Sequence, residues 1–224
     1  LAKKTSRPIH ILHVSTGEEM DFLRKHKDIC TVECLPQYLT FSAPECYDKL
    51  GTLAQMNPPI RDKKHQEALW QAIKDGTVDV LGSDHAPHTL DEKKRPYPQS
   101  PSGMTGVQTI LPIMLNHVHK GRLTLPRLVE LMSYNPAQIW KMSKQGEIKI
   151  GAWADLTVVD LNRVQRIERK WIVSRSGWSP YEGMDVTGWP TAVIIRGKIA
   201  MRDGEVLGHP QGKPFQFNIF NISK

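Results

Sequence analysis

The first half of the chain alternates between short apolar runs and segments with helical periodicity. The apolar runs at 8–14, 29–35 and 78–82 each have the length of one buried strand. Between the last two, 61–74 has the pattern of an amphipathic helix. Strands that alternate with helices indicate parallel strands covered by helices, so we expect an α/β fold here.

Capping signals and helical periodicity predict further helices. Ser15 with Glu18, and Thr16 with Glu19, both have capping-box spacing, so a helix should begin there and run to about residue 27. After a polar, proline-rich loop at 83–102, apolar positions in 107–118 recur on one helical face. Pro112 should kink or weaken that helix. Thr124 and Asn135–Pro136 predict the starts of two short helices.

The last third of the chain changes character and is rich in β-branched runs. These runs are separated by Gly, Asp and Asn turns, and Gly197–Lys198 predicts a tight hairpin. We expect a boundary near Gly146, with a first domain over 1–145 and a small β-sandwich domain over 146–224. The runs expected to form strands are 146–150, 154–160, 171–173 and 191–196.

Composition and charge exclude several classes of protein. The 224 residues are 39% hydrophobic and 24% charged, which is ordinary for a globular chain and not for a disordered one. No apolar run approaches the roughly 18 residues that a membrane span needs, so no membrane partner is expected. Lys and Arg exceed Asp and Glu by 30 to 23, but the basic groups are scattered and carry no nucleic-acid-binding signature.

The three cysteines predict the cellular compartment rather than a site. Cys30, Cys34 and Cys46 are an odd set without a CxxC pair, which argues against a disulfide framework or a zinc knuckle. We therefore expect reduced thiols and a cytoplasmic protein.

At two positions, a side chain that can bind a metal follows closely after an apolar run expected to form a strand. His13 follows the first run and Asp84 follows the third. In parallel α/β folds, functional groups gather at the carboxyl ends of strands. Imidazole and carboxylate groups are both zinc ligands, so these two residues are candidate metal ligands.

Six short sequence motifs, taken in order along the chain, resemble the C-terminal half of class I dihydroorotases, within the cyclic amidohydrolases. The resemblance covers nearly the whole chain, and Gly151-Ala-Trp-Ala-Asp-Leu-Thr-Val-Val-Asp is similar to the segment that returns to that superfamily's small β-domain. The six strings are His13-Val-Ser-Thr, Cys34-Leu-Pro-Gln-Tyr-Leu, Met56-Asn-Pro-Pro-Ile-Arg, His65-Gln-Glu-Ala-Leu-Trp, Gly82-Ser-Asp-His-Ala-Pro-His and Asn135-Pro-Ala.

The resemblance implies strands 6–8 of a (β/α)8 TIM barrel with part of a two-zinc site. His13 matches a metal-binding histidine, and Asp84 matches an aspartate that binds one metal and shuttles the proton. Asn57 and His88 match residues that hold the substrate's carboxylate and ring. Ser102–Gly103 matches a stretch whose backbone faces the pyrimidine ring. The implied substrate is dihydroorotate, or N-carbamoyl-aspartate in the reverse direction.

Two alternative functions remain beside a zinc-dependent dihydroorotase. Asn57 and His88 favour an acidic substrate because an amide and an imidazole supply fixed donors. The string Cys34-Leu-Pro-Gln-Tyr instead resembles hydantoinases, so a hydantoinase or allantoinase is the first alternative. A non-catalytic dihydroorotase-like subunit is the second, although such chains usually lose the ligands that remain here.

The remaining ligands that the resemblance requires have no counterpart in this chain. It begins just before the strand that matches the sixth, so a His-x-His pair, a bridging lysine or aspartate, and another histidine should come from an N-terminal half of the barrel. A half barrel exposes strand edges. We therefore expect the chain to associate with that half, to form homo-oligomers, and to be inactive alone.

The other histidines have less specific interpretations. His65 should lie at a helix surface or packing contact, His10 should pack against helices, and His85 is a candidate supporting residue beside Asp84. His117, His119 and His209 show no metal-ligand spacing.

Overall fold

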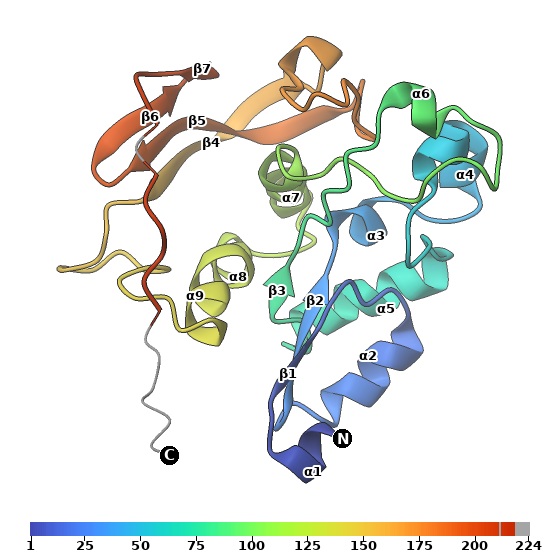
Figure 1. Ribbon diagram of the computed structural model, residues 1–224, viewed down its shortest axis with the longest axis horizontal. Helices are drawn as coiled ribbons and strands as arrows, with labels where there is room; N and C mark the ends of the chain where they lie inside the picture. The colour runs from blue at the N-terminus through green and yellow to red at the C-terminus, as the bar shows by residue number, and fades with distance from the viewer. Residues whose placement is uncertain (211, 218–224) are drawn as a thin grey trace.

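The strands of this protein form two separate sheets (Figure 1). A computed structural model describes residues 1–210 and 212–217. Strands β1 (Ile9–Ile11), β2 (Cys30–Cys34) and β3 (Val80–Leu81) form a parallel sheet in the order β1-β2-β3. The antiparallel sheet has the order β4-β5-β6-β7, with bounds Leu156–Arg166, Asp185–Ile195, Lys198–Arg202 and Glu205–Val206.

The parallel sheet confirms the three apolar runs, although each strand is shorter than its run. Side chains alternate along β2: Cys30, Val32 and Cys34 are buried, whereas Thr31 and Glu33 between them are only half-buried. Because successive strand residues point to opposite faces, one face of this sheet is covered by helices and the other is more open.

Two of the helices in the first half of the chain begin at side-chain caps. Thr16, rather than Ser15, caps α2 (Gly17–Arg24), and it forms a complete capping box with Glu19. Asp62 caps α5 (Lys63–Lys74) by accepting from the backbone of His65. The shorter helices are α1 (Ala2–Thr5), α3 (Pro36–Thr40), α4 (Glu45–Leu50), α6 (Leu90–Lys93) and the 3₁₀ turns Gly51–Ala54 and Arg169–Trp171.

Of the two prolines singled out in the sequence, Pro112 differs from its prediction, whereas Pro136 marks a helix start as predicted. Pro112 is the third residue of α7 (Ile110–His119), within the first turn, where backbone N–H groups have no intrahelical acceptor. It therefore causes no kink. The two predicted helix starts are confirmed: Thr124 caps α8 (Leu125–Val129), and α9 (Asn135–Ile139) has Pro136 in its first turn. A π-helical turn, Glu130–Tyr134, joins the two helices. The wider turn precedes the proline, whose missing N–H breaks regular helical bonding.

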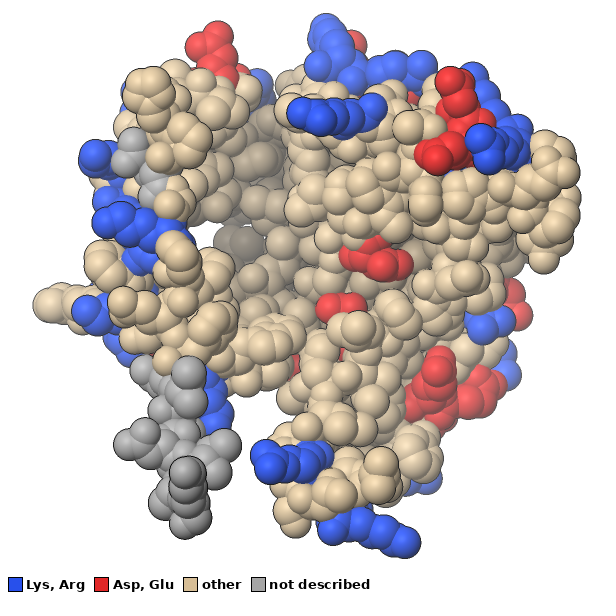
Figure 2. Space-filling model, in the orientation of Figure 1, with Lys and Arg blue, Asp and Glu red and all other residues tan. Residues whose placement is uncertain are grey.

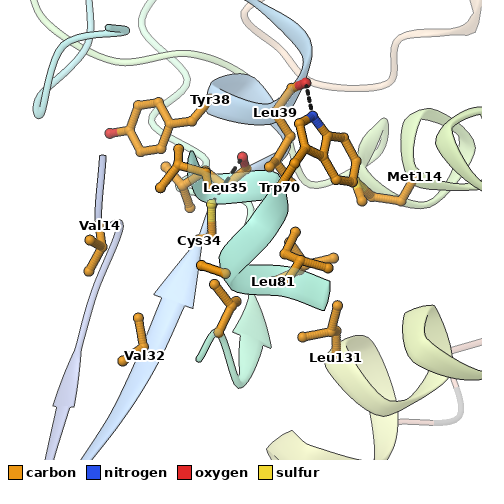
Figure 3. Close-up of a cluster of buried hydrophobic side chains, with 14 of the residues drawn as sticks. Val14, Val32, Cys34, Leu35, Tyr38, Leu39, Trp70, Leu81, Met114 and Leu131 are labelled. Atoms are coloured by element: carbon orange, nitrogen blue, oxygen red, sulfur yellow. Dashed lines mark hydrogen bonds between the residues drawn. The ribbon is translucent and has the colours of Figure 1, made fainter. Parts of the chain in front are cut away.

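The main core lies between the covered face of the parallel sheet and the helices (Figure 3). Val32 and Cys34 of β2 and Leu81 of β3 are buried there with Leu131 and Met114 from the helices that follow. At the far side of this core, the buried Trp70 of α5 donates its indole N–H to the carbonyl of Leu39 at 3.1 Å. This core fixes the three strands against the helices that cover them.

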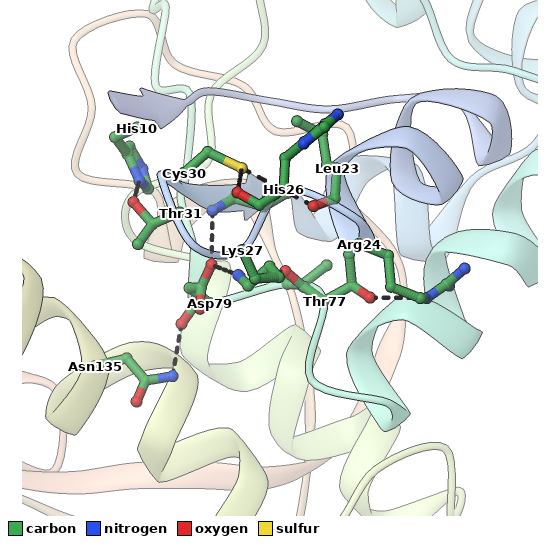
Figure 4. Close-up of polar contacts among 12 residues, drawn as sticks. His10, Leu23, Arg24, His26, Lys27, Cys30, Thr31, Thr77, Asp79 and Asn135 are labelled. Atoms are coloured by element: carbon green, nitrogen blue, oxygen red, sulfur yellow. Dashed lines mark hydrogen bonds and ion pairs between the residues drawn. The ribbon is translucent and has the colours of Figure 1, made fainter. Parts of the chain in front are cut away.

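Polar contacts join the amino-terminal ends of the strands (Figure 4). The Asp79 carboxylate accepts from the backbone N–H of Val32 at 2.7 Å and pairs with Lys27. Asn135 donates from its side chain to the carbonyl of Asp79 at 2.9 Å. These three contacts lie at the end of the sheet opposite His13 and Asp84, so they stabilise the fold and leave the other end free for chemistry.

The antiparallel sheet confirms two of the four predicted β-runs. β4 and β5 pair along most of their length, and β5 turns into β6 through Arg196 and Gly197, which both have positive φ. The segments 146–150 and 171–173 are not strands, and Ile148 and Ile150 are fully exposed. An alternating pattern needs a neighbouring strand to pair with, and none is adjacent to these segments in the described part of the chain.

The two sheets are joined through α7, which packs against β5. A side chain at Gly188 would lie 2.6 Å from the Cβ of Leu115, so this close approach requires glycine. A second apolar cluster at this junction contains Trp189, Tyr181 and Ile167.

The surface is consistent with the scattered charge of the sequence. On the face drawn in Figure 2, Lys and Arg lie dispersed around the rim instead of gathering in one patch. None of the helices in the described residues is both long enough and apolar enough to cross a membrane.

Candidate functional site

His13 and Asp84 occupy equivalent places at the carboxyl ends of β1 and β3. Both have positive φ, 40° for His13 and 41° for Asp84. This left-handed conformation is uncommon for residues with a side chain and costs on the order of 1 kcal/mol. Strain of this kind persists where the surrounding structure enforces it, and it is concentrated at functional sites. The two candidate ligands therefore share a local geometry that the sequence pattern does not reveal.

Glu33 of β2 supports the turn that carries His13. Its Oε1 accepts from the backbone N–H of His13 at 3.2 Å, and its Oε2 lies 3.9 Å from Nε2 of His10. On the β3 side, a Cβ added to Gly82 would lie 2.4 Å from the carboxyl carbon of Glu33. Gly82 thus leaves the space that the carboxylate occupies between the two strand ends.

The spacing of the strands limits what His13 and Asp84 can do together. β2 lies between β1 and β3, so the two backbones are roughly 10 Å apart. Within residues 1–210 and 212–217, no group of three or more His, Cys, Asp or Glu side chains could hold a metal ion. One imidazole and one carboxylate fit two positions of a zinc site but do not complete it.

The segment before Asp84 is held by the helix that follows β2. Buried Gln37 of α3 donates its side-chain N–H to the carbonyl of Ser83 at 2.8 Å. Burial raises the pKa of the Tyr38 hydroxyl, and the nearby negative charge of Asp84 raises it further. Tyr38 therefore stays a neutral donor, and it donates to the carbonyl of Pro58 at 2.8 Å. This bond connects the surroundings of Asp84 to the segment of Asn57.

The segments of the four candidate substrate-binding residues contact one another, and two of these residues line one cavity. Asn57 and Ser102 both line a cavity of about 670 Å³. The backbone N–H of Gly103 donates to the carbonyl of Gln55 at 2.9 Å, which ties the two segments together. A Cβ at Gly103 would lie 3.3 Å from Cδ2 of His88. Gly103 has φ of 136°, so glycine is required by conformation as well.

His88 and His85 have different neighbours. The carbonyl of His88 accepts from the indole N–H of Trp178 at 2.8 Å, which fixes the loop from the side of the β-rich region. His85 accepts at Nδ1 from the backbone N–H of Gly106 at 3.1 Å, just before α7. His85 thus orders the segment that carries Gly103, which is a supporting contact.

Three other histidines have structural contacts. His65 accepts the backbone N–H of Gly17 at 3.1 Å and so satisfies a free donor at the start of α2. His10 shares a hydrogen bond of 2.7 Å with Thr31. Burial lowers the pKa of His117 to about 4, so its ring is neutral near pH 7.

Residues 8–200 match the amidohydrolase family. This match covers most of the chain, and the fold combines the parallel and antiparallel sheets expected of it. The chain belongs to the amidohydrolase family.

The curated relatives point to a narrower group. The chain is 37% identical over 211 residues to the dihydroorotase of Anoxybacillus flavithermus, covering 91% of this chain and 48% of the relative. It is 36% identical over 213 residues to the dihydroorotase of Pyrococcus abyssi, covering 95% and 50%. The chain therefore spans about half the length of the curated relatives it matches.

Solved structures of hydantoinases have the same fold. The L-hydantoinase (dihydropyrimidinase) of Arthrobacter aurescens is 32% identical with a TM-score of 0.88, covering 92% of this chain and 48% of that one. The dihydropyrimidinase of Brevibacillus agri is 25% identical with a TM-score of 0.84, covering 93% and 48%.

Proposed function

We propose that this chain is the C-terminal half of a zinc-dependent dihydroorotase, which hydrolyses or forms the cyclic amide of dihydroorotate in pyrimidine biosynthesis. The observation that carries this proposal is that Asn57 and Ser102 line one cavity, while Gly103 donates to the segment of Asn57 and His88 lies against Gly103. Relatives about one-third identical over nearly the whole chain bear the name dihydroorotase, which supports the same choice.

The proposed architecture of the complete protein is a (β/α)8 barrel with a small β-sandwich. On this reading β1, β2 and β3 are barrel strands 6, 7 and 8, residues 1–145 form the partial barrel, and 146–224 form the second domain. The partner is the N-terminal half of the barrel. Exposed apolar side chains such as Val173 and Val206 support homo-oligomer formation, and three free, buried cysteines support a cytoplasmic location.

His13 and Asp84 fit two ligand positions of a two-zinc site, because an imidazole and a carboxylate are both zinc donors. The other ligands would come from the N-terminal half. When bound, the metals would polarise the ring carbonyl and lower the pKa of a water molecule.

The residues of this chain have separable tasks in the proposed hydrolysis. Asp84 would accept a proton from the attacking water and deliver it to the ring nitrogen as the C–N bond breaks. The Asn57 amide and the His88 imidazole would hold the substrate's carboxylate. The backbone at Ser102–Gly103 would face the ring and orient it, because glycine permits close approach.

A hydantoinase-type activity is the alternative that a specific observation favours. Gln37, in the string Cys34-Leu-Pro-Gln-Tyr that resembles hydantoinases, is buried and supports the segment of Asp84. Solved hydantoinase structures are also similar to this chain. A non-catalytic supporting subunit is the remaining alternative, which retention of both candidate ligands disfavours.

The choice of substrate is tested by His88→Ala in the complete protein. We expect dihydroorotate to be turned over far better than hydantoin by the unchanged protein. The variant should raise KM and lower kcat together for dihydroorotate, by about tenfold or more overall, because the imidazole that would hydrogen-bond the substrate is lost. The exposed His119→Ala is the matched control. Preferential turnover of hydantoin would overturn the substrate assignment.

The support of His13 by Glu33 predicts a metal-affinity effect. In the complete protein, Glu33→Ala should weaken zinc binding by about 10–100-fold, because residues that orient a ligand typically contribute that much. Competition with a chelating dye measures the affinity. Glu67→Ala, which removes a half-exposed partner of Arg122, should leave zinc affinity unchanged. An unchanged affinity in Glu33→Ala would exclude this role for Glu33.

A further inference from the structure

Lys93, the last residue of α6, is buried without an acidic partner. Its side chain is 0% exposed, and its ammonium donates to the carbonyls of Gln55 at 2.9 Å and Pro101 at 2.8 Å. The ammonium also lies 5.9 Å from the centre of the Trp178 ring. Among the residues that the structure describes, no carboxylate pairs with Lys93.

The two carbonyls that Lys93 holds belong to the two segments that carry the candidate substrate-binding residues. Gln55 precedes Asn57 by two positions, and Pro101 directly precedes Ser102–Gly103. Gln55 links the same segments, since its side chain donates to the carbonyl of Ser100 at 2.9 Å.

The backbone of Lys93 is part of the same network. Its carbonyl accepts from the hydroxyl of Ser100 at 3.1 Å and from the hydroxyl of Thr52. Trp178, whose ring faces the ammonium, donates from its indole N–H to the carbonyl of His88. Lys93 therefore has direct or one-step contacts to the segments of Asn57, His88 and Ser102–Gly103.

Burying an ammonium without a carboxylate partner costs free energy, so it is an unfavourable means of joining two loops. Removing the charge from water is unfavourable unless hydrogen bonds and nearby charges compensate, and an apolar side chain of similar size would avoid this cost. Burial is indeed the cause that lowers the pKa of Lys93, to about 8. The group remains mostly protonated near pH 7, so the site keeps one positive charge that no acidic side chain neutralises.

We propose that Lys93 is a positioning and specificity-determining residue, whose ammonium holds the Gln55–Asn57 and Pro101–Gly103 segments together and whose unpaired charge favours a carboxylate-bearing substrate. This inference rests on the proposed function, because it concerns the same cavity. It adds a preference for anionic over neutral cyclic amides that comes from a residue outside the cavity wall. Lys93 does not touch the substrate and acts through the two loops and its field.

The charged groups around Lys93 define the expected pH dependence. Its contacts Gln55, Pro101 and Trp178 do not titrate. On its own helix, the Glu92 carboxylate is engaged by Thr89, and Asp91 is exposed; Lys94 and Arg95 that follow are also exposed. The ammonium is present below pH 8 and is lost above it. KM for an anionic substrate should therefore be low where Lys93 is protonated and rise as the pH passes through about 8, up to the KM of Lys93→Met.

The experiment compares Lys93→Met, Lys93→Arg and Lys94→Met in the complete protein, with dihydroorotate as the anionic substrate and hydantoin as the neutral one. Lys93→Met should raise KM for dihydroorotate about tenfold or more, because two hydrogen bonds from a charged donor are lost. The KM for hydantoin should change less. Lys93→Arg keeps a charge that does not titrate below pH 10, so it should partly restore KM and remove the rise above pH 8. Lys94→Met, one exposed position along, should match the unchanged protein.

Each outcome decides between the claims. A folded Lys93→Met protein with unchanged KM for both substrates overturns the inference while leaving the proposed function intact. An equal rise for both substrates overturns the specificity role. If Lys93→Met does not fold, the pH profiles of the unchanged protein and of Lys93→Arg decide, and a flat KM between pH 7 and 10 in the unchanged protein overturns the inference. An unchanged protein that acts on neither substrate contradicts the proposed function itself.

Discussion

Replacing Asp84 with asparagine should lower kcat for dihydroorotate in the complete protein by about 10²–10⁴-fold, the range expected when a positioned proton-transfer group is lost. Asparagine has nearly the same shape and also tolerates the left-handed conformation that Asp84 adopts at φ of 41°. Its amide cannot accept the proton that the carboxylate would take from water. The loss would therefore report on proton transfer, with little change in backbone strain.

The control for this variant is Asp91→Asn. Asp91 is an exposed carboxylate of the same loop region, in the first turn of α6. We expect steady-state kinetics of Asp91→Asn to match those of the unchanged protein, and thermal melting of both variants to remain within a few degrees of it. A folded Asp84→Asn protein that keeps more than a tenth of the activity would refute the proton-transfer role.

The second large effect is expected on zinc content and activity when this chain is mixed with the N-terminal half of the barrel. This chain, purified by itself, should hold less than one zinc ion per molecule and show no measurable dihydroorotase activity, because two donors do not close a tetrahedral site. Adding the N-terminal half of the barrel should restore zinc binding and activity together, since electrostatic stabilisation by the metals accounts for most of the expected rate enhancement. Elemental analysis and a dihydroorotate assay on the same samples provide the two readouts.

A variant lacking one donor makes the mixing experiment specific. With His13→Ala, the N-terminal half should still associate but restore neither full zinc content nor activity. His119→Ala, an exposed histidine, should behave as the unchanged chain. Two tightly bound zinc ions in the isolated chain would overturn the prediction, and would assign ligand roles to residues such as His10, His85 or His65.

Local signals predicted the three strands of the parallel sheet and the longer helices α2, α5 and α7, but not the short helices α1, α3, α4 and α6. Each apolar run that gave a strand is long enough to be buried as one, and the predicted capping positions Thr16 and Thr124 satisfy free backbone donors within a few residues. The runs at 146–150 and 171–173 failed because a strand is stabilised by its neighbour, which a single run does not specify.

The sequence proposed some residues of the candidate site and missed others, for a related reason. Sequence motifs proposed Asn57, His88, Ser102 and Gly103 as substrate-binding residues; in the structure Asn57 and Ser102 line one cavity, and His88 lies against Gly103. Glu33 and Lys93 were missed, because a glutamate on a strand and a lysine in a charged run both look like solvated residues in the sequence. Only the tertiary structure distinguishes them from solvated residues, because it places Glu33 against Gly82 and lets Lys93 donate to two carbonyls.

By itself, the sequence predicted the order of the three parallel strands and of the longer helices beside them, the cap at Thr16, and the residues that we propose bind metal and substrate. These depend on periodicity and on short-range hydrogen bonding, which act over a few residues. Tertiary structure alone decided that His13 and Asp84 each have a positive φ, that Gly82 makes room for Glu33, and that a buried ammonium joins two loops. Such features depend on contacts between residues tens of positions apart, where desolvation and close packing are set by the whole fold.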